Sequence, residues 1–264
     1  MPSTILVTGV SSGIGYVLAK ELLEEGHTLI GLSRRKAQAL NYDHYECDLS
    51  NKKAIEATTE KIITNYKHID AIIHVAGMGI ADALEYTTYD DAEWIYRVNV
   101  LAPFYLNRLL IDQLRKSPAP KIIHVGSVAG TITIPFQAFY SMSKAALFSY
   151  SEALKMELRP FNIQVAIVLP GDIKTPFTEN RKNTYQKNDA KYHQRIERAI
   201  KKMAHDEQNG MAPETVTKVI RKLLNKKRLP VYRTVGLNYK GVLLLAKLLP
   251  HQLRSKIIYH LYAK

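Results

Sequence analysis

The sequence predicts an α/β fold in which one doubly wound parallel sheet lies between two layers of helices. Short runs rich in β-branched residues alternate with longer stretches of helical periodicity. These runs are apolar on both faces, which is typical of buried parallel strands. The intervening stretches are long enough for right-handed crossover helices, and such crossovers produce a three-layer α/β/α sandwich.

The expected elements follow from these patterns in chain order. We expect strands at residues 4–8, 28–33, 44–47, 69–75, 121–125 and 163–169, with 229–232 as a candidate last strand. Helices are expected at 13–25, 52–66, 89–115 and 139–158. Pro103 should break or bend the third, because proline lacks the amide that a helix interior uses.

The pattern changes after Pro170. Residues 176–210 are polar, with a helix expected at 190–203, and we interpret this segment as a substrate-binding lid. Pro213 then stands where a further helix should begin, since proline is favoured at the first helical position. Residues 236–264 read as an amphipathic, partly helical C-terminal extension. The pattern contains no internal repeat and no linker, so residues 1–264 are expected to form one domain.

Composition limits the class of protein. The chain has 264 residues, of which 46% are hydrophobic, enough to fill one large core. The single cysteine, Cys47, excludes an intrachain disulfide and a cysteine-rich metal cluster, and it is best interpreted as a small buried hydrophobe. We see no secretory signal, and the apolar run at 241–250 is about half of the roughly 20 residues that cross a bilayer. A cytoplasmic location is therefore expected.

The charge is unevenly distributed. Residues 1–180 carry 17 Lys and Arg against 19 Asp and Glu, whereas residues 181–264 carry 20 against 5. The basic part could meet a phosphorylated cofactor, an acyl-phosphate substrate, an acidic carrier protein, nucleic acid or lipid headgroups, or it could simply be a solvated surface. No nucleic-acid recognition motif accompanies it, so we expect no specific nucleic-acid partner.

A glycine-rich turn follows the first expected strand, in the segment Thr8-Gly-Val-Ser-Ser-Gly-Ile-Gly15. Strand, glycine turn and helix in this order are typical of the Rossmann fold, in which the helix N-terminus receives a dinucleotide pyrophosphate. A nucleoside-triphosphate loop would continue with Lys and Ser or Thr, whereas Tyr16 and Val17 stand there. The expected cofactor contacts in the turn are Gly9, Ser11, Ser12, Gly13, Ile14 and Gly15.

The end of the second strand indicates which dinucleotide binds. NAD-binding chains usually have an acidic residue here for the ribose hydroxyls, but this chain continues Ser33-Arg34-Arg35. A guanidinium group matches the geometry of a phosphate. NADP(H) is therefore favoured over NAD(H), although both arginines could also be ordinary surface residues.

Ser127, Tyr140 and Lys144 form the candidate catalytic group. Tyr140 and Lys144 are four residues apart on an expected helix, so both lie on one face of it. An ammonium near the phenol should lower the pKa of Tyr140, and such a tyrosine can exchange a proton with an alcohol or carbonyl oxygen.

Together these motifs resemble the short-chain dehydrogenase/reductase family, over at least residues 4–176. The matching pieces are the glycine turn, Asp48-Leu49, Asn99, Ser127 thirteen residues before Tyr140, Lys144, and Pro170-Gly-Asp-Ile-Lys-Thr175. In one place the chain departs from the family, which usually has Asn-Asn-Ala-Gly where this chain has His74-Val75-Ala76-Gly77. His74 could replace the asparagine as a donor or weaken the sheet there; it has no companions at metal-ligand spacing, and we expect no metal.

The resemblance implies roles for these residues. Tyr140 would be the general acid/base, Ser127 would hydrogen-bond the substrate oxygen, and Lys144 would hold the nicotinamide ribose. Asn99 would position a water linking Lys144 to solvent, Asp48 would meet the adenine, and the carboxamide would contact Ile173 and Thr175. The further cofactor contacts would be Ser33, Arg34, Arg35, Leu49, Ala76, Gly77, Pro170 and Gly171.

The implied function is an NADP(H)-dependent oxidoreductase that interconverts a carbonyl and a secondary alcohol on a small, lipophilic substrate. The alternative is an NADP(H)-binding sensor with little turnover, which should have lost Tyr140 or Lys144. The resemblance also implies a homodimer or homotetramer formed through helices 99–115 and 139–158. The leucines of 243–249, with nearby lysines, could lie on a membrane surface. We favour instead a core or subunit-interface position for them, because apolar stripes are usually buried.

Overall fold

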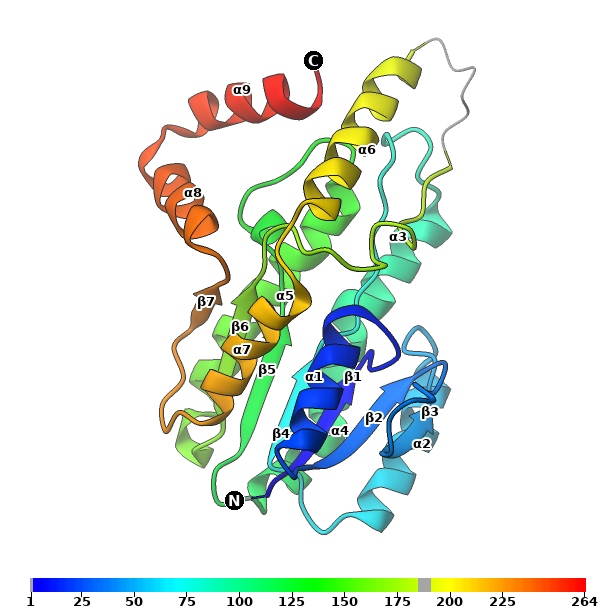
Figure 1. Cartoon of the computed structure of the whole chain (residues 1–264), viewed down its shortest axis with the longest axis vertical. Coiled ribbons are helices and arrows are strands. Elements are labelled where there is room, and N and C mark those ends of the chain that lie inside the picture. Colours follow the sequence, from blue (N-terminus) through cyan, green and yellow to red (C-terminus); the bar gives the residue numbers. More distant parts are fainter. Residues whose placement is uncertain (1, 185–190) are drawn as a thin grey trace.

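The computed structural model describes residues 2–184 and 191–264, and it contains a seven-stranded sheet in the order β3-β2-β1-β4-β5-β6-β7 (Figure 1). Every pairing in the sheet is parallel, and the order reverses direction at β1 and β4. The predicted doubly wound α/β fold is confirmed. The strands are β1 (Thr4–Thr8), β2 (Thr28–Ser33), β3 (Asp43–Glu46), β4 (Ala71–His74), β5 (Lys121–Val125), β6 (Gln164–Leu169) and β7 (Tyr232–Thr234).

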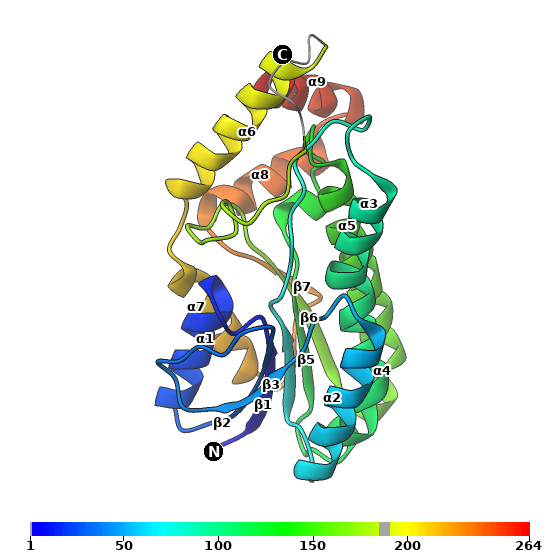
Figure 2. The ribbon, with the colours of Figure 1, turned by 90° about the vertical axis from the view of Figure 1, so that its right-hand side faces the viewer.

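Helices cover both faces of the sheet, as Figure 2 shows. One face carries α1 (Gly13–Glu24) and α7 (Pro213–Leu224), and the other carries α2 (Lys52–Asn65), α4 (Ala102–Arg115) and α5 (Ala138–Glu157). Beyond the carboxyl ends of the strands lie α6 (His193–Gln208), α8 (Leu237–Leu248) and α9 (His251–Tyr262), with α3 (Tyr89–Tyr96) to one side (Figure 1).

The core explains why the central strands of the sheet are apolar on both faces. Ile5 and Val7 of β1 belong to the cluster shared with α1 and α7, whereas Leu6 between them belongs to the cluster shared with α2 and α4. Alternate side chains of a strand point to opposite faces, so a strand covered on both sides needs apolar residues at every position. This burial fixes the sheet and places all its carboxyl ends at one edge.

The helical region 89–115 differs from the expectation. It does not break at Pro103; instead α3 continues through a π-helical turn, Arg97–Leu101, into α4, with Pro103 in the first turn of α4. The amide of Ala102 donates to the carbonyl of Arg97, and Pro103 has no amide to donate to the carbonyl of Asn99. The π-turn thus accommodates Pro103 within a continuous helix, and the carbonyl of Asn99 receives no helical hydrogen bond from Pro103.

Two other elements have boundaries that differ from the expected ones. The expected strand at 229–232 is wrong by about three residues, because β7 begins at Tyr232. The expected helix 190–203 begins at His193 and runs to Gln208, while Ala190 lies outside the described residues. Across the described parts of the chain, no helix combines the length and apolarity of a bilayer span, and no three metal-ligating side chains cluster.

Candidate active site

The turn between β1 and α1 requires its glycines for its own packing. Gly9 has a φ of +76°, and a Cβ there would lie 2.9 Å from the Cα of Ala76. A Cβ on Gly15 would lie 2.1 Å from the carbonyl oxygen of Gly9. The hydroxyl oxygen of Thr8 accepts from the amides of Val75 and Ala76, both at 3.1 Å, and ties the turn to the end of β4. The backbone therefore curves tightly around the N-terminus of α1.

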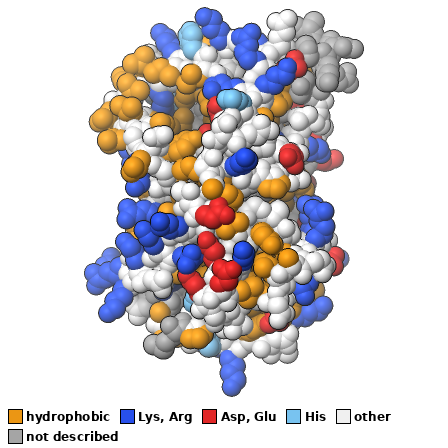
Figure 3. Space-filling view, viewed as in Figure 1, with side chains coloured by type: hydrophobic (Ala, Val, Ile, Leu, Met, Phe, Trp, Pro, Cys, Tyr) orange, Lys and Arg blue, Asp and Glu red, His pale blue; other side chains and the backbone are white. Residues whose placement is uncertain are grey.

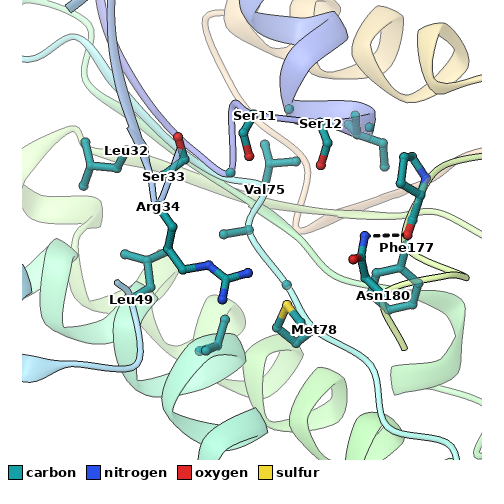
Figure 4. Close-up of a pocket in the computed structure, with 18 of the residues that line it drawn as sticks. Ser11, Ser12, Leu32, Ser33, Arg34, Leu49, Val75, Met78, Phe177 and Asn180 are labelled. Carbon is teal, nitrogen blue, oxygen red and sulfur yellow. Dashed lines mark hydrogen bonds between the residues drawn. The ribbon is translucent and has the colours of Figure 1, made fainter. Parts of the chain in front are cut away.

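This helix end offers unused donors. Ser12 is the N-cap of α1, but its side chain makes no capping bond, and the first turn carries no acidic residue. The hydroxyls of Ser11 and Ser12 turn into a cleft (Figure 4). Uncapped amides at the positive end of a helix dipole favour an anion, so this part of the cleft fits a pyrophosphate.

The ends of β2 and β3 form the far wall of the same cleft, with Arg34, Arg35, Asp48 and Leu49 among its lining residues. The side chain of Arg34 extends into it (Figure 4). The Ser33 hydroxyl donates to the carbonyl of Arg35 at 2.7 Å and shapes the strand end. No acidic side chain follows β2, and the cleft therefore presents a cation where a dinucleotide's adenosine ribose would lie.

All the predicted cofactor residues line this cleft or the pocket beside it. Sequence reasoning missed other lining residues, most of which had no motif of their own. Trp94 and Val98 could have been found from their spacing of four on a helix that runs toward Asn99. The cleft residues that were missed are Leu32, Cys47, Val75, Met78, Gly79, Trp94, Val98, Pro176, Phe177 and Asn180.

Ser127 and Tyr140 come together at the end of β5. The hydroxyl oxygen of Ser127 accepts from the amide of Ala129 at 3.1 Å, which fixes its position, and Ser127 is hydrogen-bonded to the hydroxyl of Tyr140. Both side chains line a second pocket of about 600 Å³. A substrate oxygen in this pocket can therefore meet two hydroxyl groups at once.

The expectation that the protein's own side chains lower the pKa of Tyr140 is wrong. Burial raises the pKa of Tyr140 to about 12, and the hydrogen bond with Ser127 only partly opposes it. Burial also lowers the pKa of Lys144 to about 8. The Lys144 Nζ lies 5.8 Å from the centre of the Tyr140 ring and donates to the carbonyl of Val125 at 3.0 Å. Desolvation is therefore the largest effect on the pKa of both groups.

Asn99 lies beneath the site rather than in either cavity. Its Oδ1 accepts from the amide of Met78 at 2.8 Å, and its Nδ2 donates to the carbonyl of Met78 and to the Ser143 hydroxyl, at 2.9 and 3.0 Å. A Cβ on Gly77 would lie 3.3 Å from Lys144 Nζ and 3.5 Å from Asn99 Oδ1. Asn99 thus holds the segment directly after β4, which contains Gly77 and Met78, close to Lys144.

His74 stands where the family usually has asparagine, and it makes the donor contact that was considered. Its Nε2 lies 2.8 Å from the Oδ1 of Asn107, whose Nδ2 lies 3.2 Å from His124 Nε2. The His124 Nδ1 lies 2.9 Å from the hydroxyl of Ser151, which donates to a backbone carbonyl. The two imidazoles stack at 5.0 Å. Asn107 therefore bridges β4, β5 and α4, and burial lowers the pKa of His74 to about 4.

The predicted lid, residues 176–210, contributes only part of the second pocket. Phe177 lies between the two cavities with its ring centre 5.6 Å from that of Tyr140, and Met203 and Glu207 line the second pocket. A buried ion pair joins Arg181 to Glu207. Residues 185–190 of this segment lie outside the described residues, and lid movement stays a prediction. A larger part of the apolar wall comes from α8, the residue that follows it and α9, through Val242, Leu245, Ala246, Leu249, Ile257, Ile258, Leu261 and Tyr262.

Comparison with known proteins agrees with this geometry. The model of the family described as short chain dehydrogenase matches residues 3–186. A 3-ketodihydrosphingosine reductase of Bacteroides thetaiotaomicron is 36% identical over 239 residues, covering 89% of this chain and 88% of the relative. A probable short-chain type dehydrogenase/reductase of Helicobacter pylori is 30% identical, covering 93% and 92%. The crystal structure of a short-chain dehydrogenase from Streptomyces avermitilis superposes with a TM-score of 0.81 at 24% identity, covering 97% and 96%.

Proposed function

Because this chain belongs to the short-chain dehydrogenase family and is therefore an oxidoreductase, we propose that it uses NADP(H) to interconvert a carbonyl and a secondary alcohol on a lipophilic substrate. One observation carries the proposal. The hydrogen-bonded Ser127 and Tyr140 lie with Lys144 in an apolar pocket that adjoins the dinucleotide cleft. Gly77, Ile14 and Thr175 line both cavities, so a nicotinamide ring would pass between them.

The preference for NADP(H) rests on Arg34 and Arg35. Both side chains are exposed at the end of β2 and line the cleft, and no acidic residue follows this strand to compete for ribose hydroxyls. A 2′-phosphate carries a charge that a guanidinium can meet with paired hydrogen bonds. The uncapped N-terminus of α1 would take the pyrophosphate at the other end of the cleft.

The side chains divide the chemistry between them. When bound, the cofactor would supply or accept the hydride, and the protein supplies position and protons. Ser127 would hydrogen-bond the substrate oxygen and orient the carbonyl. Tyr140 would donate its proton to that oxygen during reduction, because its side chain lines the pocket beside Ser127. Lys144 would hold the ribose, and it would return a proton from water near Asn99 to Tyr140 after reduction.

A long apolar substrate fits the second pocket best. Its wall comes largely from aliphatic side chains, and its volume of about 600 Å³ exceeds what a small ketone needs. The relative named 3-ketodihydrosphingosine reductase supports reduction of a ketone on an alkyl chain. The first substrate to test is therefore 3-ketodihydrosphingosine, followed by simpler long-chain ketones.

The test measures oxidation of NADPH and of NADH by the purified protein with these ketones. NADPH should be the better cofactor, and Tyr140→Phe should lower kcat by about 10²- to 10⁴-fold, the usual contribution of a general acid. Tyr150→Phe is the matched control, because it removes a hydroxyl from the same helix outside both cavities. It should retain activity.

Other results would redirect the proposal. Binding of NADPH without turnover of any ketone would favour the sensor alternative. Equal losses in Tyr140→Phe and Tyr150→Phe would show that the loss is structural.

Assembly is a separate expectation. We propose the dimer or tetramer through α4 and α5, because these helices expose Phe104 and Met142 among the apolar side chains of that side of the molecule. Light scattering of the purified protein measures its mass in solution and tests this expectation.

A further inference from the structure

The two C-terminal helices expose an unusual amount of apolar surface. Leu244 and Leu248 of α8 are 60% and 73% exposed, and Leu253, Ile257 and Leu261 repeat at intervals of four along α9. Only Leu243 and Ala246 of α8, and no residue of α9, are buried. The interpretation of the leucines at 243–249 as core residues is therefore wrong for Leu244, Leu245 and Leu248, while the subunit-interface position stays a prediction. In Figure 3, hydrophobic side chains gather over α8 and α9 at the upper left.

The surroundings of this face are basic. Residues 236–264 contain five lysines and arginines and no acidic residue. Lys240, Lys247 and Lys256 are exposed on α8 and α9, and Lys and Arg side chains border the apolar gathering in Figure 3. An exposed apolar face with flanking cations is the pattern of helices that lie in the interface of an anionic bilayer.

The same helices wall the candidate substrate pocket. Val242, Leu245, Ile257 and Leu261 are at least 44% exposed and also line the pocket that holds Tyr140. A side chain that is exposed and lines the pocket stands at its mouth. The pocket therefore opens between α8 and α9, on the apolar face itself.

We propose that α8 and α9 dock on the surface of an anionic phospholipid bilayer, so that a lipid substrate passes from the bilayer into the pocket between the two helices. The inference rests on the proposed function for the identity of the substrate, but the docking itself does not. A second copy of the chain is the less suitable occupant, because two such faces would bring their lysines together without a compensating acidic residue in residues 236–264.

The experiment is co-sedimentation of the full chain with vesicles of phosphatidylcholine, with and without phosphatidylglycerol. The wild type should bind the phosphatidylglycerol vesicles, and added salt should weaken the binding because the lysines are exposed. The double variant Leu244→Glu/Leu248→Glu should bind at least about tenfold more weakly, since each leucine would otherwise be withdrawn from water. Neither leucine lines the pocket.

The matched control is Leu84→Glu/Tyr89→Glu, which adds the same charge at residues that are 75% and 81% exposed before and at the start of α3. It should bind vesicles like the wild type. No wild-type binding to either vesicle, or equal loss in both double variants, would overturn the proposal. So would a change of oligomeric mass in Leu244→Glu/Leu248→Glu with vesicle binding intact, because the face would then be a subunit interface.

Turnover separates this inference from the proposed function. Both double variants should reduce a water-soluble ketone at the wild-type rate, while Leu244→Glu/Leu248→Glu should lose turnover of a long-chain ketone carried in vesicles. Vesicle binding without any NADPH oxidation would refute the function and keep the docking. NADPH oxidation without vesicle binding would refute the docking and keep the function.

Discussion

Acidification should destabilise this protein through His74. The side chain is 2% exposed, and burial lowers its pKa from 6.5 to about 4 in the folded state. Below about pH 6.5, His74 binds a proton in the unfolded chain but stays neutral in the folded chain until the pH approaches 4. The His74 contribution to stability is therefore complete above pH 6.5 and is lost progressively as the pH falls toward 4.

The size of the loss follows from these two pKa values. Between pH 7 and pH 5, binding of one proton to the unfolded chain alone changes the free energy of unfolding by about 2 kcal/mol. His124, stacked on His74 and fully buried, also has a lowered pKa, because of burial and then of the neighbouring His74. The loss for the wild type should thus be at least as large as the His74 share.

Urea unfolding at pH 7 and pH 5 measures this loss in the free energy of unfolding. His74→Asn should lower stability at both pH values, since the contact with Asn107 is lost, but its loss between the two pH values should be about 2 kcal/mol smaller than that of the wild type. Ile73→Val, a buried change on the same strand, should weaken the protein equally at both. An identical pH dependence of His74→Asn and wild type would refute the reasoning.

Three further predictions concern the site. Arg34→Glu should raise the KM for NADPH about tenfold or more while the KM for NADH changes little, because the charge pair with the 2′-phosphate is replaced by repulsion. Steady-state kinetics measures both KM values, and equal changes in the two would contradict the assignment of Arg34 to the 2′-phosphate. Gly15→Ala should abolish binding of both dinucleotides and lower the melting temperature, since its Cβ would lie 2.1 Å from the Gly9 carbonyl oxygen, and fluorescence titration with calorimetry measures both. Glu207→Gln should lower the free energy of unfolding by about 3–5 kcal/mol, because it leaves Arg181 buried without its anion. The double variant Arg181→Met/Glu207→Leu should recover most of that loss in urea unfolding. An unchanged free energy of unfolding in Glu207→Gln would contradict a structural role for the pair.

The sheet was predictable because its physical cause is local. β1, β2 and β5 match the expected residue ranges, since a parallel strand buried on both faces must be apolar at each position. β3 and β4 were also expected within a few residues. The cofactor cleft was predictable for a related reason, because the glycine turn allows few backbone courses and the carboxyl ends of parallel strands meet at one edge.

Features that depend on distant contacts were not predictable. Pro103 indicated a bend, but the π-turn that accommodates it needs the whole of α3 and α4 in place. The raised pKa of Tyr140 results from burial by side chains remote in sequence, whereas the spacing to Lys144 suggested the opposite direction. Periodicity could not predict the exposure of Leu244 and Leu248, since an apolar stripe on a helix has the same residue spacing whether it is buried or exposed to solvent.

The position of α8 and α9 in the chain separates two properties of the protein. Ser127, Tyr140, Lys144 and the dinucleotide cleft lie between residues 9 and 180, whereas a large part of the apolar wall of the pocket comes from residues 242–262. These two helices follow the last strand and take no part in sheet pairing. Changes of length or side chain in this final segment can therefore alter which alkyl chain fits without disturbing the reacting groups, so substrate range can evolve independently of the chemistry.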